Sequence, residues 1–150
     1  MKKLYFEDIE PGSQLQSPWY EVGADEIMRF ARDWDPYDFH LDEAAARASI
    51  FGGLVACTAH IFSISSRLSH DLPGELALVS GLGGDGLHLL APIRAGDRVR
   101  LVRRFLRTRL SKSKPQAGVV TIEDTLESPS GEAVFRTSGS MLIARRDDEE

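Results

Sequence analysis

Apolar and polar positions divide the chain into a helical first half and a strand-rich second half. In the segment 24–34 apolar side chains recur every three or four residues, which predicts a short amphipathic helix. In the segment 118–127 they alternate with polar side chains, as a strand with one buried face requires. A strand over 14–22 and a short helix over 42–48, with Asp42 as its N-cap, complete the first half.

The longest predicted helix runs from Leu54 to Leu72, a stretch with neither Gly nor Pro. Its first part is apolar on nearly every side, which indicates a buried helix, whereas its serine-rich second half is expected to reach solvent. An antiparallel sheet wrapped round this helix would bury it, so we expect an α+β fold. The strands expected to form that sheet are 76–81, 86–90, 97–110, 118–127 and 132–144, with turns at 83–84, 95–97, 114–115 and 129–131.

Length and composition narrow the class of protein without selecting a function. The 150 residues, 42% hydrophobic and 27% charged, predict a single globular domain over 1–150 with a charged, frayed tail at about 145–150. The net charge of −5 argues against nucleic acid or an anionic membrane as a partner. A single cysteine, Cys57, and no apolar run near the roughly 18 residues of a membrane span predict a cytoplasmic protein. No Cys or His spacing is typical of a metal site.

The densest group of ionisable and aromatic residues lies between the two short helices. Asp35 and His40 are five residues apart, with Pro36 restricting the chain between them. A carboxylate and an imidazole held to one water could add that water across a polarised double bond, since one abstracts a proton and the other protonates the α-carbon. From the pattern alone a structural role is the more common one, because an Asp near a helix end often only caps it and a lone His often lies on the surface.

The segment 35–45, in which Asp35 and Pro36 lead to His40, acidic residues and alanines, resembles the active-site loop of the MaoC-like dehydratase family. That family includes the (R)-specific enoyl-CoA hydratases. The resemblance covers roughly residues 4–145. It continues through two further segments, Phe51-Gly52-Gly53-Leu54-Val55-Ala56 and Leu89-Leu90-Ala91-Pro92-Ile93-Arg94-Ala95-Gly96-Asp97.

This resemblance implies a hotdog fold, a homodimer or higher homo-oligomer with ligand sites at the seam, and an acyl-CoA substrate. The implied reaction is the reversible hydration of a 2-enoyl-CoA thioester to a 3-hydroxyacyl-CoA, without a cofactor other than the coenzyme A of the substrate. Asp35 and His40 would activate the water. A backbone N–H at Thr58 or Ala59 would stabilise the thioester oxygen, because a helix N-terminus offers free donors.

Three residues depart from the family pattern. Thr58 replaces the usual Gly near the helix start, and Tyr37 and Asp38 replace the Asn and Pro of the hydratase loop. We expect Tyr37 and Phe39 to contact the substrate. Asp38 would raise the pKa of the catalytic pair if buried beside it, or else point to solvent. The rival functions are a hotdog acyl-CoA thioesterase and a non-catalytic acyl-CoA-binding module.

A basic run suggests where the coenzyme A phosphates would bind. The segment 98–114 holds eight of the 18 Lys and Arg residues, and no acid follows Arg98 before Glu123. Arg109, Lys112 and Lys114 are the candidates for phosphate contacts. The alternative is that alternate residues of a long strand simply face water. Nucleic acid is disfavoured because the run lacks the aromatic platforms of single-strand binders.

Overall fold

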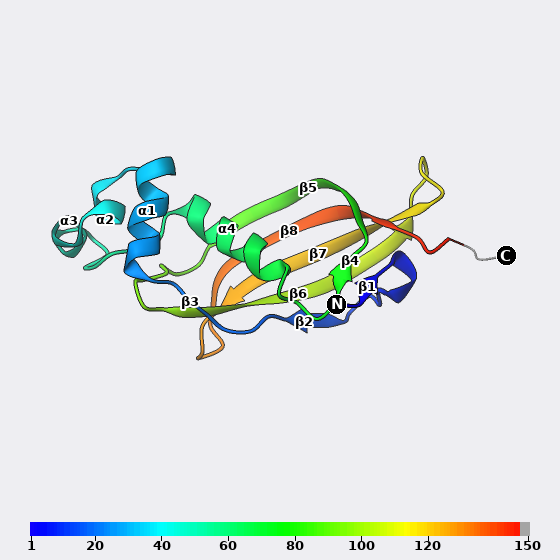
Figure 1. Cartoon of the computed structure of the whole chain (residues 1–150), viewed down its shortest axis with the longest axis horizontal. Coiled ribbons are helices and arrows are strands. Elements are labelled where there is room, and N and C mark those ends of the chain that lie inside the picture. Colours follow the sequence, from blue (N-terminus) through cyan, green and yellow to red (C-terminus); the bar gives the residue numbers. More distant parts are fainter. Residues whose placement is uncertain (148–150) are drawn as a thin grey trace.

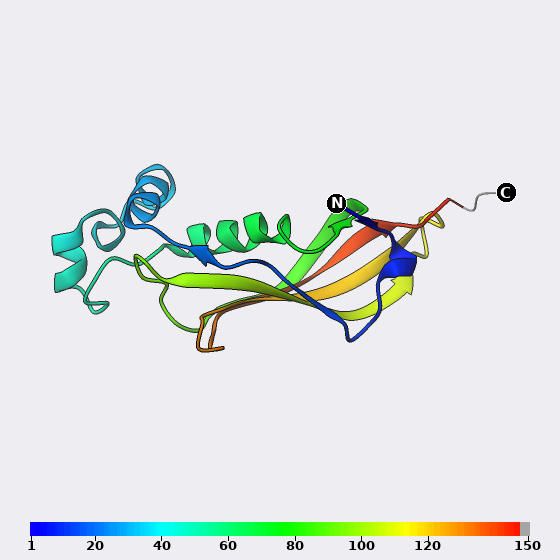
Figure 2. The same cartoon turned by 60° about the horizontal axis from the view of Figure 1, so that its bottom comes forward.

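The computed structural model describes residues 1–147 as an antiparallel sheet with one long helix lying along one face of it (Figures 1 and 2). Three shorter helices form a separate group at one end of the molecule. The helices are η1 (Phe6–Asp8), α1 (Ala24–Trp34), α2 (Asp38–Leu41), α3 (Glu43–Ala48) and α4 (Thr58–Ser69). The strands are β1 (Lys3–Leu4), β2 (Gln14–Gln16), β3 (Tyr20–Glu21), β4 (Glu75–Leu76), β5 (Leu78–Leu89), β6 (Arg98–Leu110), β7 (Ala117–Glu127) and β8 (Ala133–Ala144).

The sheet places the strands in the order β2-β6-β7-β8-β5, and β3 also pairs with β6. The hairpins β6–β7 and β7–β8 are antiparallel, so chain neighbours are also sheet neighbours over this half of the molecule. β5 pairs with β8 on one side and forms the edge of the sheet. A short parallel pair, β1 with β4, joins the N-terminus to the chain just after α4.

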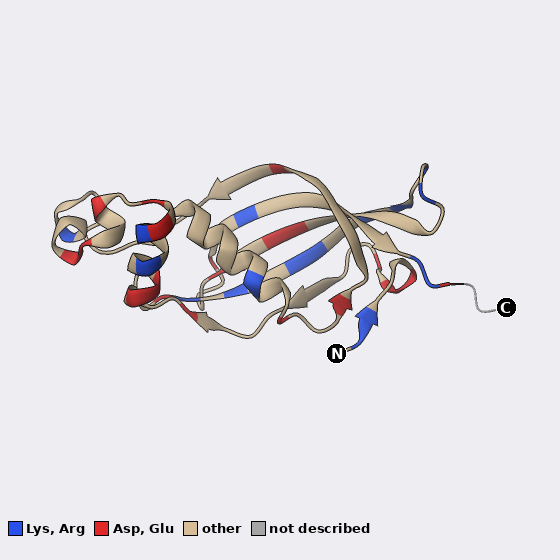
Figure 3. Cartoon of the chain, turned by 45° about the horizontal axis from the view of Figure 1, so that its top comes forward, with Lys and Arg blue, Asp and Glu red and all other residues tan. Residues whose placement is uncertain are grey.

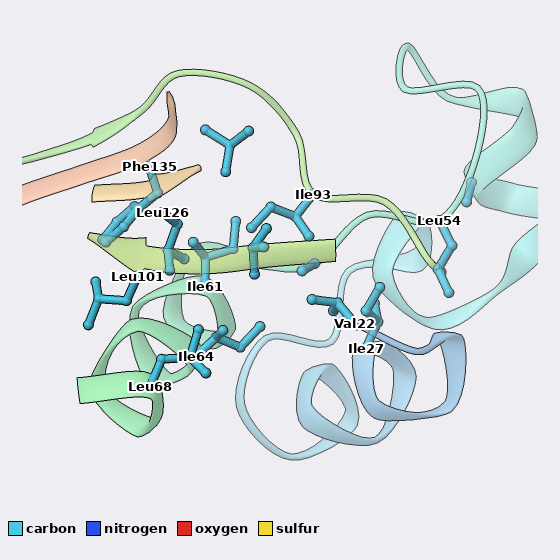
Figure 4. Packing of buried hydrophobic residues seen from close by; sticks show 14 of the residues in the cluster. Val22, Ile27, Leu54, Ile61, Ile64, Leu68, Ile93, Leu101, Leu126 and Phe135 are labelled. Carbon is cyan, nitrogen blue, oxygen red and sulfur yellow. The ribbon is translucent and has the colours of Figure 1, made fainter. Parts of the chain in front are cut away.

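The main core lies between α4 and the sheet (Figure 4). Ile61, Ile64 and Leu68 of α4 are buried in one cluster with Leu101, Leu126 and Phe135 of the strands. Side chains of this size stabilise a fold by about 1.5–3 kcal/mol each when fully buried. This contact fixes the helix on the sheet and therefore fixes where its N-terminus points.

The helix α4 begins four residues later than the sequence predicts. The residues 54–57 are extended, and their backbone bonds to the turn after β5: Ala56 N donates to Ile93 O at 2.9 Å, and Ala95 N donates to Leu54 O at 3.3 Å. An apolar run has the same appearance in a buried helix and in a buried extended segment, so the pattern could not separate the two. Ser65, expected to reach solvent, is buried.

β5 is one strand, so the turn predicted at 83–84 is wrong. The register with β8 shifts within the strand, and Gly83 and Gly86 have positive φ angles, so the glycines accommodate bulges. Gly84 passes so close to β8 that a Cβ there would lie 2.5 Å from Ser138 O. All twelve residues of β5 are exposed in the single chain.

Other local predictions hold. α1 spans the predicted residues 24–34, and the Asp42 carboxylate caps α3 by accepting a hydrogen bond from Ala45 N at 2.7 Å. The start of the predicted frayed tail is anchored instead, since Arg145 and Arg146 form ion pairs with Glu7 and Asp8; residues 148–150 lie outside the described part. Within residues 1–147 no helix is both long and apolar enough to cross a membrane.

Candidate functional site

Asp35 lies where α1 ends. Its backbone N–H donates to Ala31 O at 2.8 Å, and its φ of −155° turns the chain out of the helix toward Pro36. The proline explains this turn, because the residue before a proline is held away from helical geometry. The Asp35 side chain keeps 33% of its surface accessible. The carboxylate is therefore held beside a helix end, where it can still meet a ligand.

His40 lies in the single turn of α2, which the sequence analysis treated as loop. Its side chain is buried, and its Nδ1 is 2.7 Å from Val55 O. A carbonyl oxygen only accepts hydrogen bonds, so Nδ1 carries the proton of the neutral ring and Nε2 presents a lone pair. That Nε2 lies 3.9 Å from Asp35 Oδ2. The structure therefore brings together the two residues that the sequence singles out.

The extended residues 54–57 supply the Val55 carbonyl, and the turn after β5 holds them in place. Within that turn Arg94 N donates to Asp97 Oδ2 at 2.8 Å, and the Arg94 guanidinium donates to Phe51 O. The same turn bonds to Val22, just before α1, through Gly96 N and Asp97 O. The turn at 93–97 thus connects Val22, just before the helix that ends at Asp35, to residues 54–57, which contact His40.

The separation of the pair suits a shared small molecule better than a direct bond. A distance of 3.9 Å exceeds a normal N–H···O hydrogen bond, whereas one water could contact both the Asp35 carboxylate and His40 Nε2. Such a water would face one carboxylate and one ring nitrogen with a free lone pair. This arrangement can remove a proton from the water and return it to a substrate atom.

The N-terminus of α4 lies in the same part of the fold. Cys57 is its N-cap, and within residues 1–147 no side chain caps the helix. The first helical hydrogen bond comes from Ile61 N, so the N–H groups of Thr58, Ala59 and His60 have no partner within the helix. Thr58 and Ala59 are exposed. A helix start of this kind stabilises a negatively charged oxygen.

Aromatic side chains cover one side of His40. The Phe39 ring lies 4.4 Å from the His40 ring and stacks on Tyr37 at 5.8 Å. Tyr37 is 63% exposed, so it forms an open apolar surface next to the pair. Asp38 is exposed, which decides between the two roles considered for it: its carboxylate reaches solvent and is not buried against the pair.

The basic residues are distributed differently from the sequence expectation. Arg109, Lys112 and Lys114 are exposed near the β6–β7 hairpin, at the end of the molecule opposite α1–α3, so one chain does not bring them to Asp35 and His40 (Figure 3). Earlier in β6, Arg103 is buried in an ion pair with Asp124, and Arg100 pairs with Glu127. Sequence reasoning missed both pairs, because their acids lie on the next strand.

A second cluster, around His60 of α4, was also missed. The Tyr20 hydroxyl donates to Glu26 Oε1, and His60 Nε2 lies 3.8 Å from the same oxygen. The His60 ring stacks on Phe30 at 4.6 Å, and these side chains line a cavity of about 300 Å³ between α1 and α4. Burial lowers the pKa of His60, and the nearby Glu26 carboxylate opposes this only in part. Burial and the bond to Glu26 raise the pKa of Tyr20 to about 12.

Comparison with known sequences matches residues 8–127 to the family described as the MaoC like domain. A curated relative, protein MaoC of Klebsiella aerogenes, is 31% identical over 100 residues, which is 66% of this chain and 30% of that protein. The chain thus corresponds to less than a third of that relative.

Solved structures share the fold over nearly the whole chain. The MaoC-like dehydratase from Rhodospirillum rubrum is 36% identical with a TM-score of 0.88, covering 96% of this chain and 99% of that one. The R-hydratase PhaJ1 from Pseudomonas aeruginosa is 19% identical with a TM-score of 0.75, covering 95% and 86%. The HadBC 3R-hydroxyacyl-ACP dehydratase of Mycobacterium tuberculosis, a complex, is 17% identical with a TM-score of 0.70, covering 88% and 96%. The predicted hotdog fold is confirmed.

We predict that the His60 cluster makes stability depend on pH. The folded pKa of His60 lies below its ordinary value of 6.5, so its contribution is present above that pH and is lost as the pH falls below it. The free energy of unfolding, measured with urea at pH 7.5 and pH 5, should therefore fall on acidification. His60→Phe, which keeps the stacking on Phe30, should reduce this fall. The control His70→Gln changes an exposed histidine and should leave this fall in the free energy of unfolding unchanged. If the fall between pH 7.5 and pH 5 is the same in both variants, the prediction is wrong.

Proposed function

The chain belongs to the MaoC-like dehydratase family, and we propose that it catalyses the reversible hydration of a 2-enoyl-CoA thioester to a 3-hydroxyacyl-CoA. Family membership supports hydratase or dehydratase chemistry in general. The observation that carries the specific proposal is the pair of Asp35 and His40, 3.9 Å apart, with the ring tautomer set by Val55.

In the proposed mechanism one water lies between the two side chains. His40 Nε2 takes a proton from this water as its oxygen bonds to C3 of the enoyl group. Asp35 holds the water and stabilises the imidazolium that forms. The imidazolium then gives its proton to C2, so the pair ends in the protonation state in which it began. The steps are proton transfers, and we propose that they need no metal or redox cofactor.

The start of α4 would stabilise the intermediate. When the oxygen of water bonds to C3, negative charge moves onto the thioester oxygen as an enolate. A backbone N–H at Thr58 or Ala59 can donate to this oxygen, and the helix start adds positive potential. The Thr58 side chain leaves the donor in place, because the donor belongs to the backbone. Tyr37 and Phe39 would form the apolar wall beside the reacting carbons.

We also propose that the active form is a homodimer in which two β5 strands pair. Among residues 1–147, β5 pairs only with β8, so its other edge has no partner strand. Leu82, Leu87 and Leu89 of β5 are 53%, 43% and 50% exposed, and such an edge favours pairing with another strand. If the two β5 strands pair antiparallel about a two-fold axis, the strands of the second copy run opposite to those of the first. The partner's β6–β7 hairpin would then lie toward the helical end of this chain. Arg109, Lys112 and Lys114 of one copy would bind the coenzyme A phosphates of a substrate held mainly by the other.

Replacing the carboxylate proposed to hold the water and stabilise the imidazolium should slow the reaction strongly. Asp35→Asn keeps the shape of the side chain and removes its charge, so the rate of crotonyl-CoA hydration should fall by about 10²–10⁴-fold with an unchanged circular dichroism spectrum. The control Asp38→Asn removes an exposed carboxylate three residues away and should keep the wild-type rate. Wild-type turnover by Asp35→Asn would refute the assignment, and release of free thiol from saturated acyl-CoA would favour the thioesterase.

Charged residues on β5 should separate the dimer. Leu82→Lys combined with Leu87→Lys places two charges on the proposed seam, so the mass from light scattering should change from dimer to monomer and activity should decrease. Leu110→Lys is the matched control for the mass measurement, because Leu110 is 57% exposed but lies at the end of β6, which does not form the proposed seam. A wild-type chain that is monomeric at assay concentration would rule out the proposed seam.

A further inference from the structure

A cavity of about 690 Å³ lies between α4 and the sheet. Four residues of α4 line it, and their spacings of three and four residues place them on one face of the helix: Phe62, Ser65, Ser66 and Ser69. Thr58 lies four residues before Phe62 and therefore on the same face. The cavity thus begins about one helical turn beyond the proposed oxyanion donors and continues along α4 away from them.

The floor of this cavity carries a buried ion pair. Arg103 of β6 and Asp124 of β7 face each other across the hairpin, with Nε to Oδ1 and Nη2 to Oδ2 both 2.8 Å. Their side chains are only 7% and 9% exposed, and both line the cavity. Burying two charges is expensive even when they are paired, and an apolar pair of the same size would often be at least as stable. An alkyl chain in this cavity would form no hydrogen bond with the ion pair, so the pair would not contribute to binding such a chain.

Two hydrogen-bonding atoms remain open at this level of the cavity. Arg103 uses Nε and Nη2 on Asp124, and its Nη1 has no partner among residues 1–147. Ser65 Oγ likewise has no partner within these residues, although the residue is buried. Within the same residues only His60 Nδ1 is both fully enclosed and unpartnered, so Arg103 Nη1 and Ser65 Oγ retain contact with the cavity.

Together these observations define a polar position at a set distance from the reacting carbons. Ser65 follows Thr58 by seven residues, which corresponds to roughly 10 Å along a helix with a rise of about 1.5 Å per residue. The charge at this position is already balanced, because Asp124 neutralises Arg103. A carboxylate entering the cavity would lie beside Asp124, and an ammonium group would lie beside Arg103. An uncharged polar group can instead form hydrogen bonds with Arg103 Nη1 and Ser65 Oγ without adding a charge beside the ion pair.

We propose that this cavity receives the acyl chain and selects chains that carry a hydroxyl or oxo group near their distal end over plain alkyl chains. The proposal rests on the proposed hydratase function and names its substrate class. A polar chain end bonds to Arg103 Nη1 and Ser65 Oγ. An alkyl end displaces water from both atoms without replacing its hydrogen bonds, and this loss is the stronger basis of discrimination.

The test compares two enoyl thioesters of equal length, 8-hydroxy-trans-2-octenoyl-CoA and trans-2-octenoyl-CoA. The wild-type chain should have a kcat/KM about ten-fold or more in favour of the hydroxylated substrate, as expected for a hydrogen bond to a charged group. The double variant Arg103→Met with Asp124→Leu replaces the ion pair by apolar side chains of similar size without leaving a charge unpaired, and should reverse this preference. Ser65→Ala should weaken it and disturb the fold least.

Crotonyl-CoA is too short to reach the ion pair and serves as the reference substrate. The double variant should hydrate crotonyl-CoA at the wild-type rate. If it does so and still prefers the hydroxylated octenoyl-CoA as the wild-type chain does, the inference is overturned. Absence of crotonyl-CoA hydration by the wild-type chain would instead refute the proposed function. In that case the Kd values of 8-hydroxyoctanoyl-CoA and octanoyl-CoA, measured by calorimetry, decide the inference without turnover, and equal values in the wild-type chain would overturn it.

Discussion

The geometry of the site depends on the hydrogen bond between His40 Nδ1 and the carbonyl of Val55. This bond sets the tautomer of the ring and directs its other nitrogen toward Asp35. It exists because residues 54–57 are extended and bound to the turn after β5. The same extension delays the start of α4 to Thr58 and so determines where its free N–H groups lie. One segment of backbone therefore orients the imidazole and places the proposed oxyanion donors.

The sequence was informative wherever the structure follows local rules. The helix over 24–34 and its end before Pro36 could be predicted because spacing and proline act within a few residues. The pairing of Asp35 with His40 could be suspected because one short loop carries both. The start of α4 could not be predicted, since helical and extended apolar runs look alike until Ile93 supplies a hydrogen-bond partner. The glycines of β5 suggested a turn because nothing local shows that β8 holds them in a strand.

Charge patterns were the least reliable guide. The basic run over 98–114 suggested one anion-binding surface, yet Arg103 is buried with Asp124 and the hairpin lies at the far end of the molecule. Only the register between β6 and β7 reveals the Arg103–Asp124 and Arg100–Glu127 pairs, because the partners are 21 and 27 residues apart in the chain. His60 illustrates the same limit, since its neighbours Glu26 and Phe30 come from a helix far earlier in the sequence.

The bonds between residues 54–57 and the turn at 93–97 also have a consequence for the order of folding. Synthesis reaches Asp35, His40 and Val55 early, but the backbone partners of the extended segment come almost forty residues later. The hydrogen bonds that hold residues 54–57 extended cannot form until Ile93 and Ala95 have left the ribosome. The Val55 carbonyl that binds His40 Nδ1 is therefore held in place only after that point. The arrangement of Asp35 and His40 is thus completed late, after more than half of the chain has been made. The site therefore depends on contacts that close only when the sheet is nearly complete.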